Sequence, residues 1–107
     1  MAENRAEAHL EGGSIYLSAE AYAQYLPGLT AVALLERDGE LVLLPVRQEG
    51  AGGSMIKLVN KRGDRVIPAR EYLASCGIPE DVRFPKRCRW DDELAALRLL
   101  EVSQTPA

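Results

Sequence analysis

The chain has few of the residues from which catalytic and metal sites are usually built. Its 107 residues include one histidine and two cysteines, and aromatic residues make up only 6%. Cys76, Cys88 and His9 are too few and too widely spaced for a zinc site. A Ser-His-Asp or Cys-His arrangement would depend on His9 alone, in a segment that we expect to be frayed. The sequence therefore predicts a non-enzymatic protein with no metal or cofactor.

Long apolar runs and an export signal are also missing. The longest apolar runs, residues 31–35 and 41–46, are far too short to cross a bilayer. The first nine residues contain no apolar segment of the kind that a signal peptide needs. These observations favour a cytoplasmic protein with no membrane contact.

Charge is distributed unevenly along the chain, although the net charge is only −3. Residues 1–50 hold three basic and eight acidic side chains, residues 51–90 nine and four, and residues 91–107 one and four. The basic middle contains the candidate anion-binding residues, which are Lys61, Arg62, Arg65, Arg70, Arg83, Lys86, Arg87 and Arg89. This pattern indicates either an anion-binding face or attraction between the two halves or between two copies.

The first half predicts a turn, a strand, a helix and a hairpin. A turn at Gly12-Gly13 leads into a strand that carries Ile15 and Leu17, and Ser18 is a suitable N-cap for a helix over residues 19–26. Residues 30–36 and 41–46 form the two arms of a hairpin. Asp38-Gly39 between them supplies the positive φ angles that a tight turn needs.

The second half predicts the same order of elements. After a strand over residues 55–60 and a turn at 61–64, Val66-Ile67 extend into Pro68, which lies at or just before the first helical position. Tyr72, Leu73 and Cys76 share one face of that helix, and Gly77 ends it.

The last part of the chain is extended and then ambiguous. Residues 82–90 form an edge or bulged strand because they contain Pro85. Residues 94–102 suit either a helix or a strand by their leucine spacing, and the analogy with the first hairpin favours the strand. Cys88 lies among basic residues that could lower its pKa, but we interpret both cysteines as structural.

The two halves align when the chain is shifted by fifty residues. Five of the twenty-five pairs from residue 13 to residue 37 are identical, namely Gly13/Gly63, Ala19/Ala69, Tyr22/Tyr72, Val32/Val82 and Arg37/Arg87. We therefore predict a single domain, mostly β with two short helices, in which two tandem β-α-β-β units form a barrel about a pseudo-twofold axis. The units are residues 9–47 and 55–102, joined by a linker at 48–54 and flanked by a frayed tail at 1–8 and a tail at 103–107.

Each unit resembles the AbrB/SpoVT/MraZ group of swapped-hairpin β-barrel proteins. The resemblance rests on Gly63, Ile67-Pro68 and Cys76-Gly77-Ile78 in the second copy, and on Gly13, Ile15, Leu17 and Pro27-Gly28-Leu29 in the first. It covers nearly all of residues 9–102 and implies a DNA-binding transcription regulator that uses basic residues on strands and loops. In the second copy Asp64 stands where the family has a basic residue.

The sequence thus favours a binding module that contacts double-stranded DNA through the eight basic residues. The alternative is a protein-interaction or assembly module that binds a protein partner or itself and does not bind nucleic acid. In that case Trp90 and Tyr16 are candidate anchors, because aromatic residues are enriched at interface hot spots.

Overall fold

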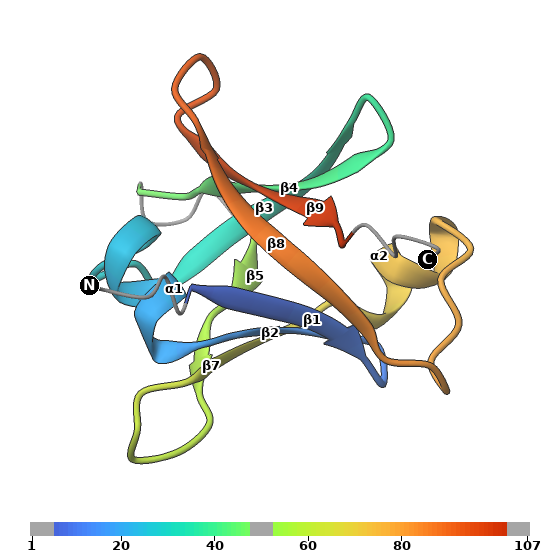
Figure 1. Ribbon diagram of the computed structural model, residues 1–107, viewed down its shortest axis with the longest axis horizontal. Helices are drawn as coiled ribbons and strands as arrows, with labels where there is room; N and C mark the ends of the chain where they lie inside the picture. Colours follow the sequence, from blue (N-terminus) through green and yellow to red (C-terminus); the bar gives the residue numbers. More distant parts are fainter. Residues whose placement is uncertain (1–5, 48–52, 103–107) are drawn as a thin grey trace, which may run out of the picture.

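The computed structural model describes residues 6–47 and 53–102, which form nine strands and two short helices (Figure 1). The strands are β1 (Glu7–Glu11), β2 (Ser14–Leu17), β3 (Ala31–Arg37), β4 (Glu40–Pro45), β5 (Ser54–Met55), β6 (Lys57–Leu58), β7 (Arg65–Pro68), β8 (Phe84–Asp91) and β9 (Ala96–Glu101). The helices are α1 (Ala19–Tyr25) and α2 (Arg70–Ser75). Within the described residues, no helix is long and apolar enough to span a membrane.

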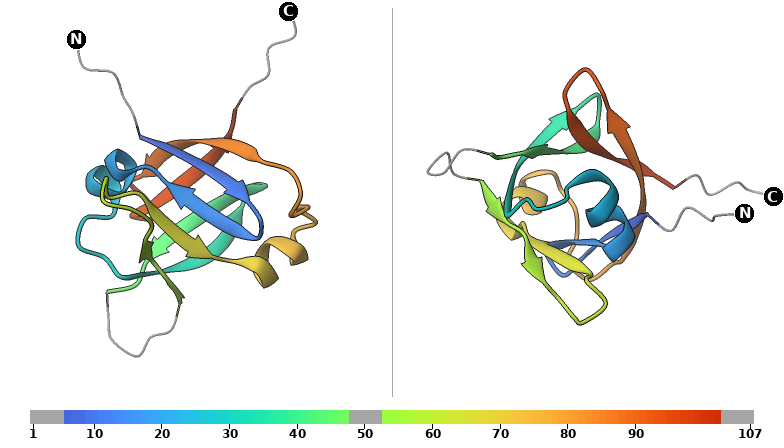
Figure 2. Two further views of the ribbon diagram at one scale, coloured as in Figure 1. Left: turned by 90° about the horizontal axis from the view of Figure 1, so that it is seen from below. Right: turned by 90° about the vertical axis from the view of Figure 1, so that its left-hand side faces the viewer.

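All nine strands belong to one antiparallel sheet that nearly closes into a barrel. Their order is β5-β3-β4-β9-β8-β1-β2-β7-β6. β5 and β6 flank Ile56 and pair with β3 and β7, so one short segment connects the two ends of the sheet (Figure 2). The N–H of Ile56 donates to the carbonyl of Thr30 at 2.8 Å, which fixes the position of this segment.

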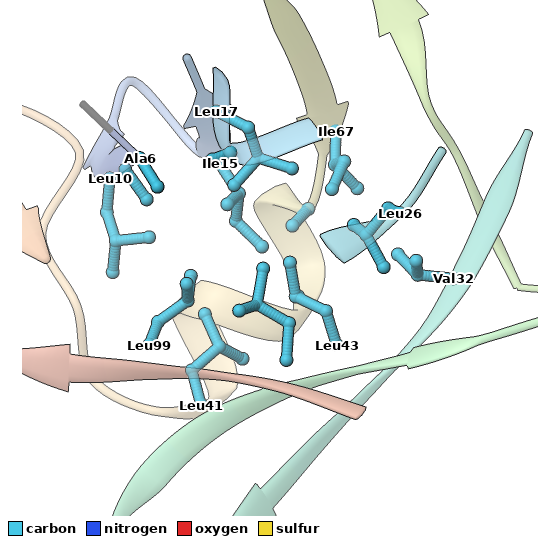
Figure 3. Packing of buried hydrophobic residues seen from close by; sticks show 14 of the residues in the cluster. Ala6, Leu10, Ile15, Leu17, Leu26, Val32, Leu41, Leu43, Ile67 and Leu99 are labelled. Carbon is cyan, nitrogen blue, oxygen red and sulfur yellow. The ribbon is translucent and has the colours of Figure 1, made fainter. Parts of the chain in front are cut away.

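The interior of the barrel is filled by aliphatic side chains that alternate along the strands (Figure 3). Ile15 and Leu17 on β2, Leu43 on β4 and Leu97 on β9 are each at most 1% exposed. Full burial of such a side chain contributes about 1.5–3 kcal/mol. The two helices lie at opposite ends of the barrel (Figures 1 and 2), so the core is covered at both ends.

Two side chains from different parts of the chain hold the first turn of α1. The Oγ of Ser18 accepts from the N–H of Ala21 at 3.1 Å, as an N-cap should. Asp64 Oδ1 accepts from the N–H of Ala19 at 2.8 Å, across 45 residues of chain. Asp64 also accepts from Asn60 at 3.0 Å, so the turn before β7 is attached to α1.

Most of the first-half predictions are confirmed, apart from the extent of the N-terminal tail. Asp38 and Gly39 have φ angles of 56° and 80°, which form the tight turn between β3 and β4. The helix begins at Ala19 as expected and ends at Tyr25, one residue early. The frayed tail predicted over 1–8 was too long, because β1 begins at Glu7 and its residue Ala8 is buried in the core.

Several element boundaries predicted for the second half differ from the structure. The strand predicted over 55–60 is interrupted at Ile56 and ends at Leu58, and Pro68 ends β7 instead of starting α2. Residues 94–102 contain the strand β9, because Leu97 and Leu99 alternate into the core. Of the linker predicted over 48–54, residues 48–52 lie outside the described residues, whereas Ser54 begins β5.

Of the two cysteines, both interpreted from the sequence as structural, only Cys88 packs against the core. Cys76 is exposed at the C-cap of α2, not on its buried face. Gly77 follows with φ of 76°, and the N–H of Ile78 donates to the carbonyl of Leu73, so the expected helix stop is present. Cys88 packs against the core, where burial raises the pKa of its thiol to about 11. The neighbouring cations therefore do not activate it.

Candidate anion-binding groove

A groove of about 860 Å³ crosses the barrel surface where β8, β1 and β2 lie side by side. The turn before β7 adds Val59, Arg62 and Asp64 to one side of it. Ala6, just before β1, and Val102, just after β9, also line it. We call this hollow the β8–β1 groove.

β8 supplies most of the positive charge of the β8–β1 groove because its side chains alternate strictly. Phe84, Cys88 and Trp90 are partly buried and pack against the core. Pro85, Arg87 and Arg89, on the opposite face of the strand, are exposed. Strand geometry therefore places both arginines outward, about 6.6 Å apart along the strand.

The β8–β1 groove brings together six of the eight basic residues singled out in the sequence. They are Arg62, Arg65, Arg83, Lys86, Arg87 and Arg89. Among the described residues, the last four have no ion pair. Arg83, Arg87 and Arg89 are exposed and so available to an anionic ligand, whereas Lys86 is partly buried on the opposite face of β8.

The other two cations of the groove are occupied within the protein. Arg62 lies 3.5 Å from Asp64 Oδ2 and 3.6 Å from Glu20 Oε1. The guanidinium of Arg65 lies 4.1 Å from the centre of the Tyr22 ring, a cation–π contact. Arg65 lies on the same face of β7 as the buried Ile67, so its role is mainly in packing.

Lys61 and Arg70 do not line the β8–β1 groove. Lys61 is exposed in the turn before β7. Arg70 lies at the start of α2, where its Nε is 3.1 Å from Glu80 Oε2 and its Nη2 donates to the carbonyl of Gly12 at 3.4 Å. The eight candidate residues therefore do not all lie in one groove.

A row of ring side chains crosses the outer surface of the sheet between the cations. Strand pairing places Pro85 opposite His9, His9 opposite Tyr16, and Tyr16 opposite Val66. The rings of His9 and Tyr16 are stacked, with centroids 4.7 Å apart and planes 6° from parallel. Pro85, His9 and Tyr16 all line the β8–β1 groove, so it combines charge with flat apolar surface.

His9 adds no positive charge to the groove at neutral pH. Burial lowers the pKa of His9 below its usual value of 6.5, and the charge of Arg83 acts in the same direction. Glu11, whose Oε1 lies 3.4 Å from His9 Nε2, opposes this shift only in part. Glu7 and Asp64 are the acidic residues that line the groove. Four unpaired cations therefore face two carboxylates, one of them already bound to α1.

In the part of the chain that the structure describes, no three His, Cys, Asp or Glu side chains lie close enough to hold a metal ion. His9 is in β1 and not in a frayed segment, which corrects the expectation from the sequence. The imidazole contacts Tyr16 and Glu11. The groove thus places unpaired cations beside the stacked rings of His9 and Tyr16.

The sequence indicated the cations but not their neighbours. His9 and Tyr16 were missed as groove residues because the pairing of β1 with β8 joins positions 80 residues apart, such as Glu7 and Arg87. The alternation of β8 around Pro85 was visible and could have separated Arg87 and Arg89 from Lys86. The chain shows no significant match to any protein-family model, curated protein or solved structure.

Proposed function

We propose that the chain is a non-enzymatic, AbrB-like DNA-binding module of the cytoplasm, acting as a transcription regulator, and that the β8–β1 groove contacts the phosphates of DNA. The observation that carries the proposal is the convergence of Arg83, Lys86, Arg87 and Arg89 on one groove, with no ion pair among the described residues. Phosphate contacts supply most of nucleic-acid affinity, and arginine and lysine are the side chains that make them.

The electrostatics of the groove support the proposal despite the acidic net charge. Of the acidic residues of the first half, only Glu7 lines the groove, while Glu11 and Glu20 contact the groove residues His9 and Arg62. The three exposed cations, Arg83, Arg87 and Arg89, can neutralise about three phosphates. The slope of log affinity against log salt for duplex DNA is then about −2.7.

Titration of the protein with a labelled duplex at increasing salt tests the proposal. Replacing Arg87 and Arg89 together by Gln removes two phosphate contacts, so the slope should become shallower by about 1.8. The matched control replaces Lys57 and Lys61 by Gln. Both lysines are exposed and neither lines the β8–β1 groove, so this variant removes the same charge elsewhere.

The proposal fails if the parent binds no duplex at low salt, or if the two double variants lose affinity equally. Binding of a protein partner or of a second copy by a chain that does not bind nucleic acid would instead favour the interaction module.

We also propose that the barrel consists of two copies of one swapped-hairpin unit, at residues 9–47 and 55–102. The order β2-α1-β3-β4 recurs as β7-α2-β8-β9. β2 and β7 pair antiparallel with Tyr16 opposite Val66, two positions that the fifty-residue shift also aligns. β4 and β9, the last strands of the two units, pair in the same antiparallel sense.

Separate expression of residues 1–50 and 51–107 tests the two-unit proposal. Each half contributes strands to one shared core, so each alone should be unfolded by circular dichroism, and their mixture should regain the β spectrum. A stable fold in either half alone, or no recovery on mixing, would contradict the proposal.

A further inference from the structure

We propose that the β8–β1 groove takes a single strand of nucleic acid in preference to a duplex. This rests on the proposed function of the same groove and names its substrate class. Proteins that hold single strands combine a positively charged groove that follows the backbone with rings against which the bases pack. The β8–β1 groove contains both parts.

The cations form a track along one strand. Arg83 precedes β8, and Arg87 and Arg89 lie on its outer face two residues apart. A spacing of about 6.6 Å along a strand is close to the separation of successive phosphates in an extended nucleotide chain. An extended single strand can therefore meet Arg87 and Arg89 with neighbouring phosphates.

The ring row supplies the apolar surface next to this track. His9 and Pro85 are directly opposite each other on β1 and β8, and Tyr16 stacks on His9 from β2. Because the pKa of His9 is lowered, its ring is uncharged at neutral pH and offers apolar surface. Bases unstacked from a single strand have exposed faces and edges that can pack on these rings, whereas in a duplex the base faces are covered.

The shape of the site also separates the two ligands. Val59 and Arg62, in the turn before β7, line the groove beside the rings, whereas the side chains of Ala8 and Leu17 belong to the barrel core. A duplex keeps its bases stacked on one another, so it can reach the cations of the groove but cannot pack base faces on the ring row. A single strand can use the rim cations and the ring row together.

The experiment compares labelled single-stranded oligothymidylate with a duplex of equal length, by fluorescence anisotropy at low salt. We expect the single strand to bind at least about tenfold more tightly. Tyr16→Leu keeps an apolar side chain on the outer face of β2 but removes the ring. It should weaken single-strand binding roughly tenfold while changing duplex binding less than about twofold.

The salt slope distinguishes loss of a ring contact from general damage. Tyr16 contributes no charge, so the slope for the single strand should be the same in Tyr16→Leu and the parent, in contrast to the Arg87/Arg89 double variant. If Tyr16→Leu does not fold, His9→Val gives a second measurement, because His9 is also on the outer face and valine suits a strand.

Each result supports or overturns the inference. Equal or tighter duplex binding overturns it and leaves the proposed DNA-binding function in place. If neither the single strand nor the duplex binds, both the inference and the proposed function are overturned. Competition by poly-glutamate as effective as that by unlabelled oligonucleotide also overturns it, since the groove would then be a site for acidic peptides.

Discussion

The contact between Asp64 and the first turn of α1 allows the effect of losing this side chain on the free energy of unfolding to be predicted. Asp64 Oδ1 accepts from the N–H of Ala19 at 2.8 Å, and Oδ2 accepts from Asn60 at 3.0 Å. Loss of a helix-capping side chain costs about 1 kcal/mol. Loss of the partly exposed bond to Asn60 adds about 0.5 kcal/mol. Asp64→Ala should therefore lower the free energy of unfolding by about 1.5 kcal/mol, and Tm by roughly 6 °C.

The pH dependence follows from the protonation of the same carboxyl. Hydrogen bonds from Asn60 and from the N–H of Ala19 hold the pKa of Asp64 below its ordinary value of 3.8. A carboxyl with a lower pKa in the folded state stabilises the fold fully above its unfolded pKa, and this contribution is lost as the pH falls through the folded pKa. Asp64→Asn should thus be less stable than the parent at pH 7, and the difference should shrink below about pH 4.

Urea denaturation followed by circular dichroism at pH 7 and pH 3 measures both effects. Asp92→Ala is the control, because Asp92 is an exposed aspartate in the turn between β8 and β9. The reasoning is refuted if Asp64→Ala unfolds within about 0.3 kcal/mol of the Asp92→Ala control at pH 7, or if the gap between Asp64→Asn and the parent is as large at pH 3.

Three further predictions follow from the fold. Gly39→Val should destabilise by about 1–3 kcal/mol in thermal melts, because Gly39 has φ of 80°; an unchanged Tm would contradict the tight turn. At pH 8 iodoacetamide should modify the exposed Cys76 and leave Cys88, whose raised pKa of about 11 keeps it protonated, unless the chain is unfolded; mass spectrometry would show equal labelling if this is wrong. Arg98→Met should cost about 2 kcal/mol in urea melts, since its mostly buried guanidinium lies 3.0 Å from both Asp91 and Glu40; a cost below that of the Asp92→Ala control would refute this.

Local signals in the sequence predicted the turns and the helix stop. The groove could not be predicted in the same way, because it depends on pairing between strands far apart in the chain. The turn at Asp38-Gly39 and the stop at Gly77 follow from backbone preferences of neighbouring residues, so they were predictable. Cys76 was misplaced because α2 is only six residues long, too short for its periodicity to define a buried face. The β8–β1 groove depends on β1 meeting β8, which no local pattern encodes. Six of its cations could still be identified, because charge clustering is visible in sequence.

The pairing of β1 with β8 has a consequence for how the chain is made. β1 and β2 are adjacent in sequence and can form their hairpin early, as can β3 and β4. The other edge of β1 pairs with residues such as Arg87, so it has no partner until β8 has left the ribosome. Folding dominated by contacts of this separation is slow, on the order of milliseconds to seconds. Throughout synthesis β1 therefore exposes an open edge to other nascent chains, and chaperone binding at residues 7–11 would protect it.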